Sequence, residues 1–150
     1  MNIFESILKS DKCLDGWTQI GSRCFIYDAT LRDYDGSSEY CKHIGGMIAS
    51  VHSETENNAM LSLFPVNNDK VVYIGAERQN FGAGTQWKWH DGSHWWQPSH
   101  HGGLYGHETR IAVNCPHCGN DGLWHDWANG EARLGVICTL NPNDAGINIQ

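Results

Sequence analysis

The sequence predicts an α+β domain with two short helices, antiparallel sheets and a long irregular loop, stapled by disulfides. Two segments with helical periodicity occur early in the chain, and short apolar strands follow them. Between the strands, residues 90–110 lose this periodicity and are rich in Gly, His, Ser and Pro. The six cysteines are an even number, which is compatible with three bridges and an oxidising compartment.

Length and charge restrict the class of protein. A chain of 150 residues suits one domain, which we place at residues 13–140, between an N-terminal extension 1–12 and a flexible tail 141–150. The net charge is −7 and no basic face is apparent, so nucleic acid is a poor partner. No apolar run reaches the roughly 18 residues of a membrane span. The first ten residues lack the pattern of a signal peptide, so we expect that any secretion signal has been removed.

Two segments predict helices. Residues 35–44 place apolar side chains on one face, and a Gly-Gly pair follows and ends the helix. The second helix begins with a capping box, in which Ser53 is the N-cap and Glu56 follows three residues later. We expect this helix to end before Pro65.

The predicted strands are short apolar segments bounded by turn residues. They are a hairpin strand that starts at Phe25, and residues 47–51, 71–74, 85–89, 111–113, 123–124 and 134–139. The structureless loop between them is unusually long for a compact domain, which favours a functional role for it.

Several motifs occur in a fixed order across residues 13–140. They are Cys-x-x-Gly-Trp and Cys-Phe-Ile-Tyr within 13–27, Cys-x-x-x-Gly-Gly-Met-Ile-Ala-Ser from Cys41, Val-Tyr-Ile-Gly at 72–75, Trp-x-Trp-x-Asp-Gly-Ser from Trp87, Leu-Trp-His-Asp at 123–126 and Val-Ile-Cys ending at Cys138. This ordered set resembles C-type-lectin-like domains in their long form. The resemblance implies that fold, and a secreted, extracellular carbohydrate-binding lectin of innate defence or recognition.

The resemblance also implies two of the bridges. These are Cys13–Cys24 and Cys41–Cys138. The second bridge encloses nearly the whole domain. In the chain-entropy model, a disulfide that closes a loop of about 100 residues stabilises the folded state by on the order of 4–5 kcal/mol. The family's further bridge across the binding loop has no counterpart, because the matching positions read Arg110 and about Asn129. We therefore expect a weaker clamp on the loop.

A site for a divalent metal follows from the same resemblance. In sugar-binding members, calcium is held by residues whose positions match Gln97, Ser99, Glu108, His125 and Asp126 here. Calcium takes about 6–8 oxygen ligands, and two vicinal sugar hydroxyls can complete its shell. We predict that Gln97, Glu108, His125 and Asp126 hold the metal.

Two substitutions depart from this calcium pattern. Ser99 offers only a hydroxyl, and His125 offers nitrogen, which calcium does not favour. Seven of the nine histidines lie between residues 90 and 125, and zinc needs only about four ligands. Further imidazoles could come from His94, His100, His101, His107 and His117. We favour calcium over zinc, and a solvated polar loop without a functional metal is the third interpretation.

The sugar prediction rests on the loop composition. Gln-Pro-Ser at 97–99 is nearer the Gln-Pro-Asp of galactose binders than the Glu-Pro-Asn of mannose binders, and residues 100–108 resemble their glycine-rich insertion. We therefore predict galactose or N-acetylgalactosamine, with Tyr105 stacking on the sugar and Trp96 as the second candidate. For Trp95 or Trp96, packing is the simpler role. The predicted sugar-binding residues are Gln97, Ser99, Tyr105, Glu108, His125 and Asp126.

Cys115-Pro-His-Cys118 matches a redox motif that elsewhere opens a helix. Here a turn sequence, residues 119–122, follows and cannot supply that helix. We favour a local Cys115–Cys118 disulfide. A zinc-binding knuckle, redox catalysis and pairing between chains are the alternatives.

Three functions compete at this point. The first is a metal-dependent lectin that gains useful affinity from several sites, with a homo-oligomer as one route. The second is a sugar-inactive C-type-lectin-like domain that binds a protein, ice or mineral surface. The third, a metal-dependent hydrolase, lacks the His-Glu-x-x-His motif and any nucleophile motif. We therefore expect no enzyme.

Overall fold

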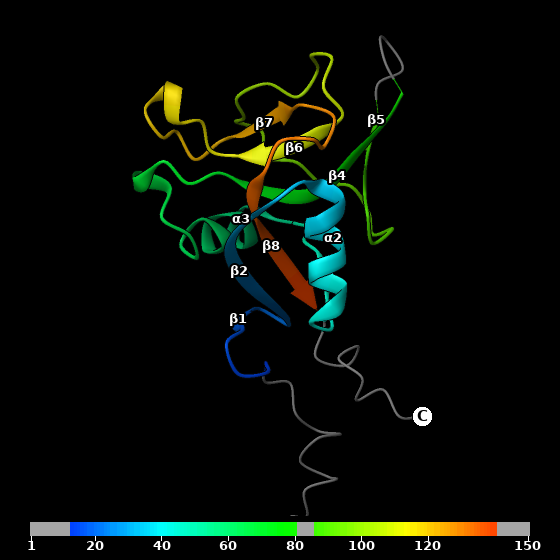
Figure 1. Cartoon of the computed structure of the whole chain (residues 1–150), viewed down its shortest axis with the longest axis vertical. Coiled ribbons are helices and arrows are strands. Elements are labelled where there is room, and N and C mark those ends of the chain that lie inside the picture. Colours follow the sequence, from blue (N-terminus) through cyan, green and yellow to red (C-terminus); the bar gives the residue numbers. More distant parts are fainter. Residues whose placement is uncertain (1–12, 81–85, 141–150) are drawn as a thin grey trace, which may run out of the picture.

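The computed structural model describes residues 13–80 and 86–140. The expected extension 1–12 and tail 141–150 lie outside the described residues. Figure 1 shows the elements, which in chain order are β1 (Thr18–Ile20), β2 (Arg23–Arg32), α2 (Tyr34–His43), β3 (Met47–Ile48), α3 (Glu54–Leu61), the 3-10 turn η1 (Val66–Asn68), β4 (Val72–Asn80), β5 (Gln86–Trp89), β6 (Arg110–Val113), the 3-10 turn η3 (Pro116–Cys118), β7 (Trp124–Trp127) and β8 (Leu134–Leu140).

The strands form a mixed sheet in the order β1-β2-β8-β4-β6-β7, with β3 paired to β8 and β5 paired to β4. The predicted α+β class is confirmed, and the pairs are antiparallel as expected except for β4 and β8, which are parallel. The physical reason lies in β8. All but the first of its residues are buried, and a continuous apolar run suits a central strand with neighbours on both edges and no face in water.

Helix α2 begins at Tyr34, one residue before the expected start. The carboxylate of Asp33 caps it by accepting a hydrogen bond from the Gly36 backbone N–H at 2.8 Å. The helix ends at His43, and Gly45 follows with a φ of 96°, a conformation that glycine adopts without steric cost.

Helix α3 confirms half of the predicted capping box. The Ser53 hydroxyl accepts from the Glu56 N–H at 3.1 Å. The Glu56 carboxylate accepts instead from the backbone N–H of His52 at 2.9 Å and from the guanidinium of Arg23 at 2.7 Å. The helix start is therefore tied to β2 rather than closed on itself.

The strand expected at residues 47–51 is shorter, because only Met47 and Ile48 pair with β8. Ala49 next donates to the Ile137 carbonyl at 2.9 Å and accepts from the Gly75 N–H at 2.7 Å. This segment thus links β8 to β4 without continuing a ladder. A Cβ at Gly75 would lie 2.8 Å from the Ile48 carbonyl oxygen, so the close approach requires glycine.

The core has two parts. One surrounds the fully buried Trp89 and Trp124, and the other surrounds the Cys41–Cys138 bridge. The structure contains the three expected bridges, Cys13–Cys24, Cys41–Cys138 and Cys115–Cys118. Within the described ranges, no helix has the length and apolar character needed to cross a membrane.

Candidate cation and glycan site

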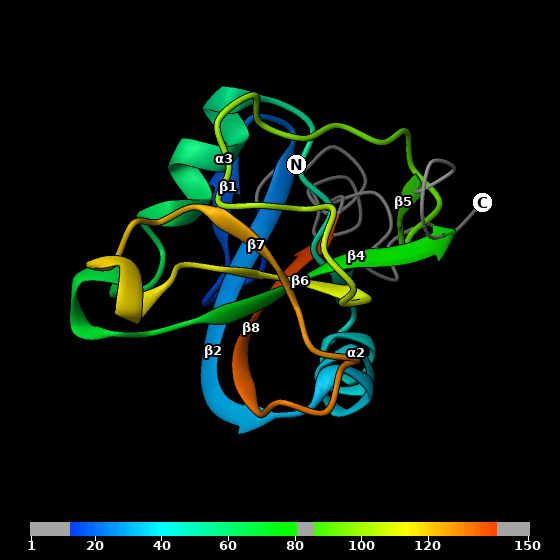
Figure 2. The ribbon, with the colours of Figure 1, turned by 90° about the horizontal axis from the view of Figure 1, so that it is seen from above.

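The long loop, residues 90–109, leaves β5 and folds back beside β7 before it enters β6 (Figure 2). Backbone bonds hold it there: the Gly102 N–H donates to the Trp124 carbonyl at 2.8 Å, and the Asp126 N–H donates to the Gly103 carbonyl at 2.7 Å. The indole N–H of Trp87 also donates to the carbonyl of the buried Leu104 at 2.9 Å. The loop is irregular but firmly attached, so its polar side chains have defined positions.

Tryptophans pack under the loop. The ring centroid of Trp95 lies 4.4 Å from that of Trp89, and the centroid of Trp96 lies 5.9 Å from that of Trp124. Both loop tryptophans are partly buried against the core. Packing is therefore a role of both residues, and this counts against Trp96 as the main sugar-stacking ring.

Glu108 and Asp126 come together at the end of the loop. The Glu108 N–H donates to Asp126 Oδ2 at 3.4 Å. Burial and the negative charge of Asp126 raise the pKa of Glu108 above its ordinary value. A Cβ at Gly106 would lie only 2.5 Å from Asp126 Oδ2, so glycine leaves room for this carboxylate. A carboxylate whose ionisation is disfavoured by a neighbouring negative charge forms an arrangement that a divalent cation would relieve.

Gln97 and Tyr105 form a second group. The Gln97 amide N–H donates to the Tyr105 hydroxyl at 3.1 Å, while its carbonyl oxygen accepts from the Trp95 indole N–H at 3.0 Å. The Tyr105 side chain is 59% exposed and presents an aromatic face to solvent. The two residues line a shallow pocket of about 320 Å³ with Trp87. Trp95 and a second amide, that of Gln86, complete the lining, and aromatic rings with a few polar groups suit a small polar ligand with an apolar face.

His125 lies apart from these groups. It precedes Asp126 in β7, and successive side chains of a strand point to opposite faces. Its Nε2 lies 2.9 Å from Asp121 Oδ2, and its imidazole sits against Gly102 on the other side. The prediction that His125 shares one ion with Asp126 therefore has to be revised.

The predicted four-residue site is thus divided in three: Glu108 with Asp126, Gln97 with Tyr105, and His125 with Asp121. The other predicted sugar contact, Ser99, is exposed on the loop. Sequence reasoning missed Asp121 and Gly106. Asp121 was detectable as the carboxylate four residues before His125, within a Cys-x-x-Cys-x-x-Asp-x-x-x-His spacing.

The missing family bridge has a polar replacement. The Thr109 hydroxyl donates to the Asn129 side-chain oxygen at 2.9 Å, between the two segments that the bridge would join. Next to it, Arg110 pairs with Trp127 in the β6–β7 ladder, and its guanidinium carbon lies 4.4 Å from the ring centroid of Tyr34. The end of the loop is held by non-covalent contacts alone at this point.

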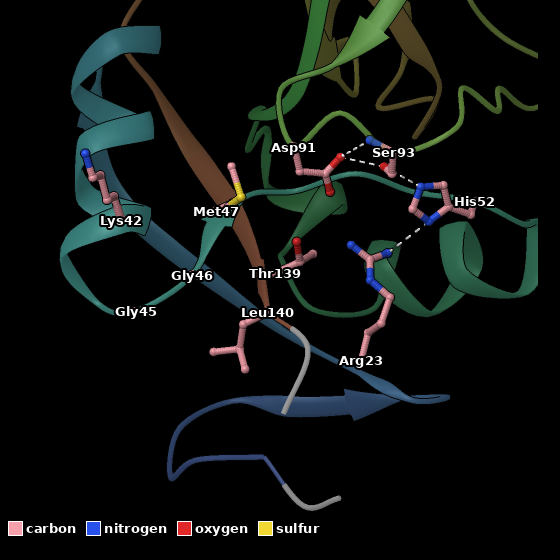
Figure 3. Close-up of a pocket in the computed structure, with 10 residues that line it drawn as sticks. All are labelled: Arg23, Lys42, Gly45, Gly46, Met47, His52, Asp91, Ser93, Thr139 and Leu140. Atoms are coloured by element: carbon pink, nitrogen blue, oxygen red, sulfur yellow. Dashed lines mark hydrogen bonds between the residues drawn. The ribbon is translucent and has the colours of Figure 1, made fainter. Parts of the chain in front are cut away.

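A larger cavity of about 610 Å³ lies between the start of β2, the end of α2, β3 and the end of β8, and Asp91 and Ser93 at the start of the long loop also line it (Figure 3). Glu108 and Asp126 are not among its lining residues. Three of its side chains are of the types found in the catalytic triad of serine hydrolases. His52 Nε2 lies 2.8 Å from Ser93 Oγ, and Ser93 contacts Asp91. Arg23 approaches His52 Nδ1 at 3.4 Å.

The direction of these bonds argues against catalysis. The Ser93 hydroxyl donates to Asp91, so His52 Nε2 has to donate to Ser93 Oγ, which leaves Nδ1, the nitrogen that faces the Arg23 guanidinium, without a proton. Burial and Arg23 lower the pKa of His52, which favours this neutral form. An imidazole that donates to the serine cannot remove the serine's proton, so the cluster is a hydrogen-bonded brace between β2, α3 and the loop.

The family model of the lectin C-type domain matches residues 30–140. The chain belongs to the C-type lectin domain family. The match begins within β2 and ends with β8, so it contains the long loop and all the site residues described above.

Relatives within this family differ in what their names state. The chain is 35% identical over 81 residues to a type-2 ice-structuring protein of Hemitripterus americanus, a match that covers 54% of this chain and 46% of the relative. It is 30% identical over 112 residues to ladderlectin of Oncorhynchus mykiss, covering 69% of this chain and 57% of the relative. It is also 30% identical over 90 residues to the galactose-specific lectin nattectin of Thalassophryne nattereri, covering 56% of this chain and 53% of the relative. The chain thus spans about half the length of these relatives.

Among solved structures, a calcium-independent type II antifreeze protein superposes with a TM-score of 0.67 at 27% identity, over 87% of this chain and 95% of that one. The C-type lectin fold of this chain is therefore established. Because family members include both lectins and antifreeze proteins, membership alone does not assign the ligand.

Proposed function

We propose that this chain is a lectin that binds galactose-type glycans through a divalent cation, calcium first, held by Glu108 and Asp126. The observation that carries the proposal is the approach of the Asp126 carboxylate to the backbone N–H of Glu108, where the charge of Asp126 also raises the pKa of the Glu108 side chain, on a loop that exposes Tyr105. Binding of galactose or N-acetylgalactosamine, rather than mannose, is supported by the loop pattern and by the relative named as a galactose-specific lectin.

Calcium fits this pair better than zinc does. Carboxylate oxygens are hard ligands that calcium prefers, and two carboxylates can supply up to about four oxygens of its shell of about 6–8. Water and sugar hydroxyls would supply the rest. Because His125 bonds on the opposite face of β7, the nitrogen that calcium disfavours lies outside this set. With so few protein ligands we expect weak binding, in the range of about 10⁻⁴–10⁻³ M typical of extracellular modules.

The sugar contact lies on the adjacent surface. An exposed ring such as Tyr105 can pack on the apolar face of galactose, while the Gln97 amide has donors to direct at hydroxyls. A single site of this kind is weak, so several copies on one assembly would be needed for firm attachment to a glycan surface. Three disulfides favour an extracellular location for this activity.

Retention on galactose resin tests the proposal. Wild-type protein should be retained with calcium, elute with EDTA and elute with free galactose more readily than with mannose. The double variant Glu108→Gln/Asp126→Asn should lose retention while its folding, measured by circular dichroism, is unchanged. The matched control Glu54→Gln/Glu131→Gln removes two exposed carboxylates elsewhere and should bind like wild type. Retention that survives EDTA, or survives the double variant, would contradict the proposal.

A second function is favoured by a specific observation, the 35% identity to an ice-structuring protein. In that case the same surface would bind ice, or a protein, without sugar. Thermal hysteresis in the presence of EDTA, together with a glycan array that stays blank with calcium, would support this alternative and exclude the lectin.

A further inference from the structure

One group of His, Cys and acidic side chains in the described part of the chain has ligand atoms close enough to share an ion. Its members are Cys115, Cys118, Asp121 and His125, whose ligand atoms all lie within 4.8 Å of one another. They occupy the connection from β6 to β7, on the face of β7 opposite to Asp126. Nothing in the proposed calcium site uses these four residues.

The group is pre-organised by its backbone. Asp121 Oδ1 accepts from the N–H groups of Cys115 at 3.1 Å and Leu123 at 3.0 Å, so the turn fixes this carboxylate. Its second oxygen, Oδ2, is thereby directed to His125 at 2.9 Å. A Cβ at Gly102 would overlap the imidazole, so glycine at that position leaves room for the ring.

In the structure the two sulfurs are joined, which occupies them. This bridge differs from the other two in its exposure. Cys118 is exposed, whereas Cys13 is half-buried like Cys115, and the other three cysteines, Cys24, Cys41 and Cys138, are 0% exposed. Reductants reach a disulfide by direct attack on a sulfur, so the exposed bridge is the one that opens first.

We propose that reduction of the Cys115–Cys118 disulfide converts this group into a zinc site with two sulfur, one nitrogen and one oxygen ligand. A dithiol supplies two electrons and two protons and leaves as its disulfide, or a phosphine supplies the electrons while water supplies the two protons and the oxygen of the phosphine oxide; in either case the S–S bond breaks and two thiols form. Zinc then displaces one proton from each thiol, because the thiolate is the ligand.

The dimensions fit a tetrahedral ion. Zinc–sulfur bonds of about 2.3 Å and zinc–nitrogen or zinc–oxygen bonds of about 2.0 Å place neighbouring ligand atoms roughly 3.3–3.8 Å apart. The ligand atoms here already lie within 4.8 Å, so the sulfurs need only separate after the bond breaks and His125 withdraw slightly from Asp121. Two thiolates and an imidazole favour zinc over calcium. All four ligands come from the protein, as in structural zinc sites, so no coordination position is left open for a substrate.

The test uses the full chain. Limiting phosphine, followed by alkylation and peptide mass mapping, should show Cys115 and Cys118 free while the other four cysteines remain paired. The reduced protein should then bind one zinc per chain by elemental analysis, and cobalt in its place should give thiolate-to-metal absorption. The oxidised protein should bind none at this site.

Variants separate this site from its neighbours. His125→Ala and Asp121→Asn should each weaken zinc binding more than about 100-fold, since loss of supporting groups alone costs about 10–100-fold. Asn at 121 keeps an oxygen for the two backbone N–H groups, so the turn should still form. His117→Ala, in the exposed part of the same turn, is the matched control and should bind like wild type.

Three results would overturn the proposal: zinc binding that is equal before and after reduction, retention of wild-type affinity in His125→Ala, or opening of Cys41–Cys138 before Cys115–Cys118. The Glu108→Gln/Asp126→Asn variant should keep its zinc. Its outcome therefore tells the two metal proposals apart.

Discussion

Asp126 and His125 are consecutive residues of β7, and their side chains make bonds on opposite sides of the strand. Asp126 Oδ2 faces the backbone of Glu108 at 3.4 Å, while His125 Nε2 faces Asp121 at 2.9 Å. The period of a strand is two residues, so the two side chains leave β7 on opposite faces and contact different groups in this structure. The proposed calcium site and the proposed zinc site therefore lie on different faces of β7.

Two glycine substitutions should each affect only one of the two proposed metal sites. Gly106→Ala would push a methyl group to 2.5 Å from Asp126 Oδ2, so we expect a tenfold or greater loss of calcium-dependent galactose binding, a cost of roughly 1.4 kcal/mol or more. Gly102→Ala would instead displace His125 and impair zinc binding by the reduced protein. Calcium and zinc titrations of both variants provide the check. If either substitution weakened both metals equally, the two sites would not be independent.

The pKa of Glu108 should lie above its ordinary value in the metal-free protein. Burial and the charge of Asp126 both raise its pKa, so the folded state disfavours the ionised form. The stability that protonated Glu108 contributes at low pH is therefore lost as the pH rises through its raised pKa, and calcium should restore it. Carboxyl NMR titration should show the Glu108 midpoint fall in Asp126→Asn. An unchanged midpoint would show that the two charges do not interact.

Tyr34→Phe should destabilise the domain at neutral pH. The Tyr34 hydroxyl donates to Glu77 Oε2 at 2.7 Å; burial alone would raise the pKa of Glu77, but hydrogen bonds from Tyr34 and His90 hold it below its ordinary value. A hydrogen bond to a charged group is worth about 1.5–3 kcal/mol. Because the pKa is depressed, this stabilisation exists above the unfolded-state pKa and is lost as the pH falls through the folded-state value.

Urea denaturation at neutral and acidic pH measures this effect. The control Tyr105→Phe removes an exposed hydroxyl and should change the free energy of unfolding by less than about 0.5 kcal/mol. An equal loss for Tyr34→Phe at both pH values would argue for lost packing instead of the ionised hydrogen bond.

Asn57→Ala should leave a buried donor without a partner. Asn57 Oδ1 accepts from the indole N–H of the fully buried Trp124 at 2.9 Å. An unpaired buried group costs about 1–3 kcal/mol, and we expect a loss of that size by denaturant unfolding. Asn58→Ala lies on the exposed side of the same helix and should have almost no effect. Equal losses in the two variants would mean that helix propensity, rather than the hydrogen bond, is responsible.

Much of the fold could be predicted from local patterns. The Gly-Gly pair ended α2 as expected, and Ser53 capped α3 through its hydroxyl. The parallel pairing of β4 with β8 could not be foreseen, because it joins segments far apart in the chain and the apolar pattern of β8 does not reveal its neighbours. Similarly, the Glu56 carboxylate accepts hydrogen bonds from the His52 N–H and the Arg23 guanidinium. Residue spacing does not predict the bond from Arg23, because Arg23 lies in a distant part of the sequence.

The site was harder to predict for a geometric reason. Matching positions along the sequence identified Glu108 and Asp126, which the fold does bring together. The same procedure added His125, since a linear motif does not record that adjacent strand residues face opposite ways. The predicted strand covered only residues 123–124, whereas β7 extends to Trp127 and includes both His125 and Asp126. The alternation of these two side chains was therefore not considered.

The start of β2 and the end of β8 lie side by side, since Cys24 pairs with Leu140, and Figure 1 shows β1 and the end of β8 remote from β6 and β7. A tether joined before β1 or after β8 would therefore attach on the side of the domain away from β6 and β7. Molecules attached to a sensor chip by one end or the other should present the same surface to the analyte, and many such molecules arrayed side by side would act as a multivalent coating.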